Sequence, residues 1–182
     1  MDELSLFQER LRSQRPVPWE QLPDFALYMD QVLSYMERQV ILLDENDALT
    51  SAMVNNYTKN GLVPRATGKK YNRDHLAYLT AVSILKRVMP AKDIDLLLRE
   101  ELQGRTIVDG YADFCASLDA ALEQTAQEME GYKDEQQLAD AAIHFALLSY
   151  AAGVASRQYV TLLRERSEIA GESVKKSKKE KE

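Results

Sequence analysis

Apolar residues recur at helical spacing along most of the chain, but the width of the apolar stripe changes from segment to segment. The rhythm after Asp24 predicts one helix over residues 24–43, and a broader stripe predicts a second over residues 73–89 that packs on two sides. Pro90 separates this second helix from a leucine-rich helix over residues 91–102. The chain is therefore expected to be mainly α-helical.

The segment from residue 50 to residue 72 breaks this regularity. Thr50 predicts the N-cap of a short polar helix over residues 51–60, because its hydroxyl can accept a hydrogen bond from a free backbone N–H of the first turn. Gly61 ends that helix, and residues 62–72 then predict a small basic β-hairpin. This order is typical of a winged helix-turn-helix, in which the helix enters the DNA major groove and the hairpin, called the wing, lies on a phosphate strand.

The last third of the chain predicts two long helices with heptad-like apolar spacing. One covers residues 111–132, and the other runs from residue 136 to residue 170. A short turn joins them, so we expect an antiparallel helical hairpin, and the unpaired part of the longer helix's stripe predicts a homodimer. A monomer whose long helix folds back over the first domain is the alternative.

Three features of the sequence bear on where the protein resides. The chain has a single cysteine and begins with a polar segment that lacks the features of a signal peptide, so a cytoplasmic location is expected. The longest apolar run, Ala141–Ala155, is shorter than a bilayer-spanning helix and is expected to be buried, so no membrane partner is predicted. Residues 171–182 are rich in lysine, which predicts a disordered basic tail with weak, unspecific affinity for nucleic acid.

Positive charge is concentrated in one part of an acidic chain. The 182 residues carry a net charge of −6, yet residues 50–90 contain seven basic residues and a single acidic one. Residues 1–49 and 91–170 are both acidic. The basic segment coincides with the predicted helix and wing, which favours a phosphate-binding face over an ordinary solvated surface.

The residues expected to contact DNA fall into two groups. Asn can pair with adenine through two hydrogen bonds, and Ser or Thr can bind a base or a phosphate, so the first group is expected at bases or nearby phosphates: Thr50, Ser51, Asn55 and Asn56. The second group is expected to hold phosphates: Tyr57, Lys59, Arg65, Lys69, Lys70 and Arg73. If about six cations neutralise phosphates, log affinity should fall with log salt at a slope of about −5. Ala52, Met53 and Tyr57 are expected to face the interior.

The sequence contains no pattern that predicts catalysis, a metal site or a cofactor. The only histidines, His75 and His144, lack a ligand-spaced partner; His75 is expected at the surface and His144 inside a helical core. Cys115 lies on an apolar stripe and is expected to be a packed thiol. We therefore expect a protein that is not an enzyme.

Residues 55–89 resemble the DNA-binding unit of MerR-type regulators. That unit has a helix ending in Tyr, a Gly-Leu pair, a Pro, a basic wing, a second Tyr and a helix that opens with an acidic residue, and the matching positions are Tyr57, Gly61, Leu62, Pro64, Tyr71, Asp74, Leu76 and Leu79. Asn55 stands where the family usually has Arg, and the linker before Thr50 is longer than usual. Most of residues 17–110 is similar to an uncharacterised bacterial family, the domain of unknown function 1836, whose members resemble MerR-related regulators. The resemblance implies that Tyr57 and the wing cations meet the DNA backbone and that the C-terminal helices dimerise.

These patterns predict four regions: an N-terminal extension over residues 1–18, a winged helix-turn-helix domain over residues 19–105, a helical dimerisation or sensor region over residues 106–170 and a basic tail over residues 171–182. The expected function is transcription regulation through binding of double-stranded DNA. Two alternatives remain open. One is a protein-interaction module that keeps the winged scaffold and uses its acidic helical hairpin to hold a partner protein. The other is a sensor whose alanine-rich bundle encloses a small apolar ligand.

Overall fold

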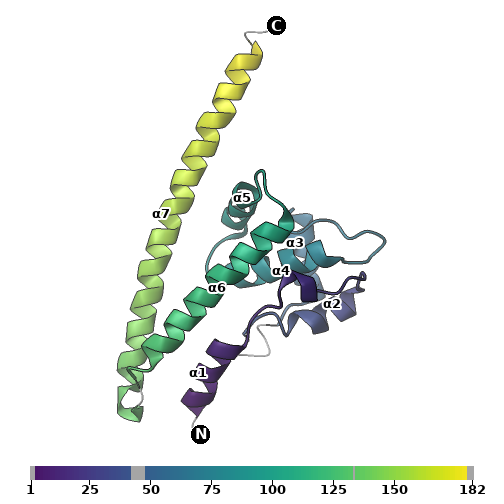
Figure 1. Cartoon of the computed structure of the whole chain (residues 1–182). Helices are drawn as coiled ribbons and strands as arrows, with labels where there is room; N and C mark the ends of the chain where they lie inside the picture. The colour runs from purple at the N-terminus through teal and green to yellow at the C-terminus, as the bar shows by residue number, and fades with distance from the viewer. Residues whose placement is uncertain (1–2, 42–47, 133, 180–182) are drawn as a thin grey trace. The chain divides into compact units, whose positions relative to one another are not determined.

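The structure is a computed structural model that describes residues 3–41, 48–132 and 134–179. The described residues form seven α-helices and short 3-10 turns, so the expectation of a mainly α-helical protein is confirmed. The chain divides into two compact units, residues 1–133 and residues 134–182 (Figure 1). The helices are α1 (Glu3–Ser13), α2 (Met29–Met36), α3 (Ser51–Lys59), α4 (Arg73–Leu85), α5 (Ala91–Glu101), α6 (Ile107–Met129) and α7 (Leu138–Lys179).

Helix α4 forms the centre of the first unit. Its side chains Leu76, Leu79 and Val82 have no solvent exposure, and the helix packs against both α2 and α6. Packing on two sides is what its broad apolar stripe predicts, because a helix with one buried face needs only a narrow stripe. The same core receives Val54 from α3 and Ile94 from α5.

Within the first unit, the N-terminal segment is attached to α6. Gln8 Nε2 donates to the Ala126 carbonyl oxygen at 2.8 Å, and Arg15 pairs with Asp119. The Tyr111 hydroxyl donates to the Val17 carbonyl oxygen at 2.8 Å. These bonds join residues about a hundred positions apart, so α1 and α6 lie side by side, in agreement with their contacts.

Local hydrogen bonds set the ends of α3 and α4 as the sequence predicts. The Thr50 hydroxyl accepts from Met53 N at 3.2 Å, and Asn72 Oδ1 accepts from His75 N at 3.3 Å. Gly61 has a positive φ of 76°, which an L-residue with a side chain rarely adopts. The helices therefore begin and end where neighbouring side chains satisfy the free backbone groups.

Helix α2 is shorter than the predicted helix over residues 24–43. The backbone of Leu27 is paired with Tyr71, at 2.8 Å from Leu27 N to Tyr71 O and 2.9 Å from Tyr71 N to Leu27 O, so it cannot join a helix. Helix α2 begins only after Tyr28, whose backbone N–H is accepted by Gln31 Oε1 at 2.9 Å. The end of the predicted helix, residues 42–43, lies outside the described residues.

The predicted β-hairpin wing is wrong, because the described part of the chain contains no β-strand and only two isolated bridges, Thr67 with Lys70 and Leu27 with Tyr71. Gly68 and Lys69 have φ angles of 58° and 64°, which close a tight two-residue turn. Beyond that turn the two arms separate. The outgoing arm buries Leu62 and Val63 in the core, while Tyr71 on the returning arm pairs with Leu27. We call residues 64–71 the basic loop; it projects at the right of Figure 1.

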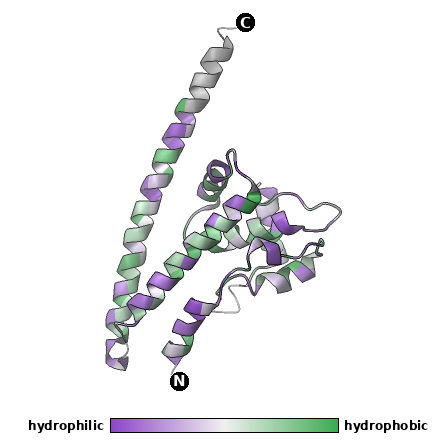
Figure 2. Ribbon diagram, in the orientation of Figure 1, coloured by the Kyte–Doolittle hydropathy of each residue, from purple (hydrophilic) through white to green (hydrophobic). Residues whose placement is uncertain are grey.

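The second unit consists of a 3-10 turn (Glu135–Gln137) and α7. The stretch Leu138–Ile169 is long and apolar enough to cross a membrane by length and composition, and none of its most apolar window is buried. Hydrophobic residues recur along it (Figure 2). The prediction that residues 141–155 are buried is therefore wrong: Leu147 and Tyr150 are 63% and 68% exposed. The described part of the unit has no second α-helix to cover them.

Two expectations about the C-terminal part remain predictions. The antiparallel hairpin of α6 and α7 is one. The disordered tail is the other: α7 continues to Lys179, into the stretch 171–182 for which the sequence predicts disorder, and residues 180–182 lie outside the described residues.

Candidate nucleic-acid interface

Helix α3 presents a narrow buried face and a broad polar one. Val54 is fully buried and Tyr57 is 3% exposed, and both belong to the hydrophobic core. Because these two residues are three positions apart, they define the inward face of the helix. Ala52 and Met53 lie on the exposed side, so the expectation that they face the interior is wrong.

The exposed side of α3 carries the polar residues that the sequence singles out. Ser51, Asn55 and Asn56 are all exposed. Asn56 Oδ1 accepts from Asn60 Nδ2 at 3.0 Å, and the Thr50 hydroxyl oxygen is used as the N-cap acceptor. The side chain of Asn55 has no hydrogen-bond partner among the described residues, so its amide can offer both a donor and an acceptor to an incoming base.

Four of the predicted phosphate-binding cations are exposed: Lys59, Arg65, Lys69 and Lys70. None of them forms an ion pair with a described residue. By contrast, the surface arginines of α1 and of the α5–α6 link pair with carboxylates. The cations of α3 and the basic loop therefore keep their charge uncompensated within the described chain.

Two other predicted phosphate contacts are less accessible and also make structural contacts. Arg73 is half-buried, and its Nε donates to the Leu22 carbonyl oxygen at 2.9 Å. Tyr57 is in the core, and burial raises the pKa of its hydroxyl. A side chain that is 3% exposed offers no surface to a phosphate, so we remove Tyr57 from the phosphate contacts.

His75 is buried, which corrects the expectation of a surface residue. Its ring is 6% exposed and makes an edge contact with Tyr71. Nδ1 accepts from Asn72 N at 3.1 Å, and the Arg65 carbonyl oxygen lies 3.2 Å from Nε2. Both ring nitrogens are therefore engaged, Nδ1 with Asn72 and Nε2 with the Arg65 carbonyl oxygen. His75 thus joins the start of α4 to the basic loop, and the capping spacing from Asn72 to His75 is the sequence signal that points to it.

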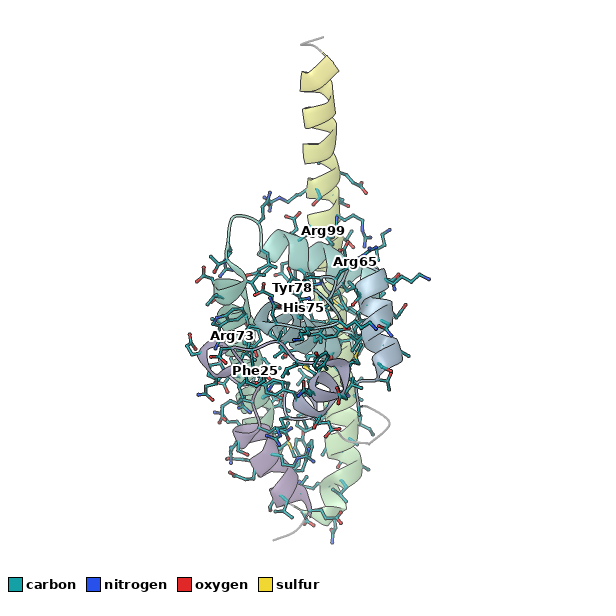
Figure 3. All side chains as sticks on the ribbon, turned by 90° about the vertical axis from the view of Figure 1, so that its right-hand side faces the viewer. Phe25, Arg65, Arg73, His75, Tyr78 and Arg99 are labelled. Carbon is teal, nitrogen blue, oxygen red and sulfur yellow. The ribbon has the colours of Figure 1, made fainter. Side chains whose placement is uncertain are left out.

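Sequence reasoning did not identify two exposed aromatic residues that lie just before α2. Phe25 is 63% and Tyr28 is 51% exposed. The Lys70 ammonium lies 5.2 Å from the centroid of the Tyr28 ring. Figure 3 is viewed from the side on which the basic loop projects and labels Phe25, Arg65, Arg73 and His75. No local pattern signals this proximity, because it depends on the pairing of Leu27 with Tyr71.

The rest of the described first unit has no cluster of metal ligands, but it does contain hollows. No group of three His, Cys, Asp or Glu side chains among the described residues could hold a metal ion. An apolar cavity between α4, α5 and α6 measures about 60 Å³, and a more polar hollow lined by Leu62, Tyr78, Asp95 and Arg99 measures about 290 Å³. Cys115 packs against the core, and burial raises the pKa of its thiol, which disfavours the reactive thiolate.

Residues 17–114 match the protein family described as a domain of unknown function, DUF1836, over more than half of the chain. The chain belongs to the DUF1836 family. The matched DUF1836 region contains α2 to α5, the basic loop and the first turns of α6. Neither a curated protein nor a solved structure matches the chain significantly.

Proposed function

We propose that this DUF1836 protein is a DNA-binding transcription regulator in which α3 reads the major groove. The observation that carries the proposal is the group of exposed cations on α3 and the basic loop, which form no ion pair with the described residues of an otherwise acidic protein. Salt screens electrostatic interactions beyond about 10 Å, so a polyanion near this surface is attracted by its positive charges although the whole chain is negative. The resemblance of residues 55–89 to MerR-type regulators also supports it.

The contacts divide into reading and positioning roles. Asn55 supplies base contacts, because an exposed amide can donate to and accept from the adenine edge at once. Lys59, Arg65, Lys69 and Lys70 hold phosphates and set the position of α3. The buried His75 ring holds the start of the basic loop in place through its bond to the Arg65 carbonyl oxygen.

The test begins with selection of bound fragments from genomic DNA, followed by titration of a recovered duplex and of a scrambled duplex. Asn55→Ala should weaken binding to the recovered duplex by about 1–3 kcal/mol and change binding to the scrambled duplex little. Gln103→Ala is the matched control, since it removes an exposed amide from the link between α5 and α6. Failure to enrich any fragment would refute the proposal.

We propose further that two copies associate through α7. Its exposed apolar residues need a partner, and the charge along the helix favours an antiparallel pair. Residues 134–156 contain three acidic residues and no basic one, whereas residues 157–182 contain eight basic and five acidic residues. Antiparallel pairing brings the acidic half of one α7 to the basic half of the other, while parallel pairing places like charges together.

Single cysteines in a Cys115→Ser background test this arrangement. Ala152→Cys lies near the middle of the stripe, so it should cross-link two copies on oxidation in either orientation. Leu138→Cys lies at one end and should cross-link only in a parallel pair; we expect no product. Cross-linking of Leu138→Cys would contradict the antiparallel arrangement. A monomer in sedimentation that floats with lipid vesicles would refute self-association and favour a membrane as the partner of α7.

A further inference from the structure

The segment before α2 places two aromatic rings in solvent, and one of them, Tyr28, lies against Lys70 of the basic loop. Phe25 and Tyr28 are both more than half exposed, whereas Leu27 between them is buried. Most of the large side chains that follow in the first unit are packed: Tyr57 and Tyr71 belong to its core. Two exposed rings within four residues are therefore a local feature rather than scattered surface apolarity.

The backbone beneath these rings is held firmly. Leu27 and Tyr71 exchange two hydrogen bonds, and Arg73 Nε donates to the Leu22 carbonyl oxygen. On the other side of the loop, the bond between His75 and Arg65 O fixes its start. The backbone that carries the two rings and the loop cations is therefore anchored, so little conformational entropy is lost when a ligand binds there.

The chemistry of this surface suits a nucleobase flanked by phosphates. Lys70 lies over the Tyr28 ring, and Lys69 follows Gly68 in the tight turn at the tip of the loop. Base stacking on aromatic rings together with phosphate binding by cations is the common means of holding unstacked nucleotides. Asp24 is exposed next to Phe25, which disfavours a phosphate at that ring and leaves the uncharged face of a base as its partner.

We propose that Phe25 and Tyr28 stack on bases at a locally unstacked step of the bound duplex, while Lys69 and Lys70 hold the flanking phosphates. The inference rests on the proposed function and deepens it, because it names the class of DNA that is favoured: sites with a flexible pyrimidine–purine step beside the sequence that α3 reads. Such steps unstack at the lowest cost, and inserted apolar side chains kink DNA at them. Two rings suffice for one step, whereas a single-strand track needs a longer series of rings.

The experiment uses the full chain and a recovered genomic duplex in which 2-aminopurine replaces adenine at each TA or CA step in turn. Wild-type protein should raise the fluorescence at one step, because unstacking relieves quenching of the base. Phe25→Ala and Tyr28→Ala should abolish this rise and weaken binding by about 5- to 150-fold each. Tyr28→Phe is the matched control, because it keeps the ring and should keep both signals. Both rings are exposed, so circular dichroism and thermal unfolding of the variants should match the wild type.

The possible outcomes separate this inference from the proposed function. If wild-type protein binds the duplex but the two alanine variants bind it equally well and no step brightens, the inference is overturned and DNA binding stands. If the single-stranded form of the same sequence binds more tightly than the duplex, the unstacked-duplex proposal is also overturned. If no duplex binds at all, both proposals fall together.

Discussion

Replacing the two lysines at the tip of the basic loop should change the salt dependence of DNA binding by a predictable amount. Lys69 has a φ of 64°, where alanine would be strained, so the suitable change is Lys69→Asn combined with Lys70→Gln. Asn tolerates this conformation, and each of the two substitutions removes one positive charge without adding apolar surface. The variant therefore isolates the charge from the shape of the turn.

The expected magnitude follows from the number of exposed cations that have no ion pair within the part of the chain that the structure describes. Lys59, Arg65, Lys69 and Lys70 give four phosphate contacts per chain, so log affinity should fall with log salt at a slope of about −3.6. This is shallower than the slope of about −5 expected from the sequence, because Arg73 is half-buried and donates to the Leu22 carbonyl oxygen, which leaves four exposed cations. Removing two contacts should bring the slope to about −1.8, and a pair of chains on one site would double both values.

Fluorescence anisotropy of a labelled duplex, titrated at a series of salt concentrations, measures both slopes. The matched control is Lys86→Gln with Lys92→Gln, which lowers the net charge equally at exposed positions outside the basic loop. The control should keep the wild-type slope. Equal slopes for the control and the loop variant would refute the reasoning, since only the net charge would then matter. If the affinity of the wild type did not change with salt concentration, the protein would make no phosphate contacts.

Three further changes test how the interface is supported. His75→Ala removes the bond to Arg65 O and the cap of α4, and should weaken DNA binding while leaving the salt slope unchanged, because no cation is lost. Gly61→Ala places a side chain at a φ of 76° and should lower the free energy of unfolding in urea by about 1 kcal/mol. Burial raises the pKa of Tyr111, so the unfolded chain loses that proton near its ordinary value of 10.0 while the folded chain keeps it. The free energy of unfolding should therefore be constant below about pH 10 and fall above it. Tyr111→Phe should lose less stability at alkaline pH, and it should be about 1 kcal/mol less stable at neutral pH because it lacks the bond to Val17. Urea unfolding at each pH measures both effects.

The features that follow from the order of residues alone are those whose interactions close within a few positions. Thr50 and Asn72 begin helices because each accepts from a backbone N–H three residues ahead, and Pro90 separates α4 from α5 for an equally local reason. The concentration of basic residues between positions 50 and 90 and the match to DUF1836 are likewise properties of the chain itself. None of these depends on which distant segments meet.

The features that only the folded chain determines are those that depend on a partner far away in the sequence. A basic turn was visible in the sequence, but the backbone of Tyr71 pairs with Leu27, more than forty residues earlier, so no wing forms. The same pairing shortens α2 and brings Tyr28 beside Lys70 of the loop, and the core decides that Tyr57 and His75 face inward. Side-chain polarity states what a residue can contact, whereas burial in a shared core decides which of those contacts remain available, and burial is set by the whole fold.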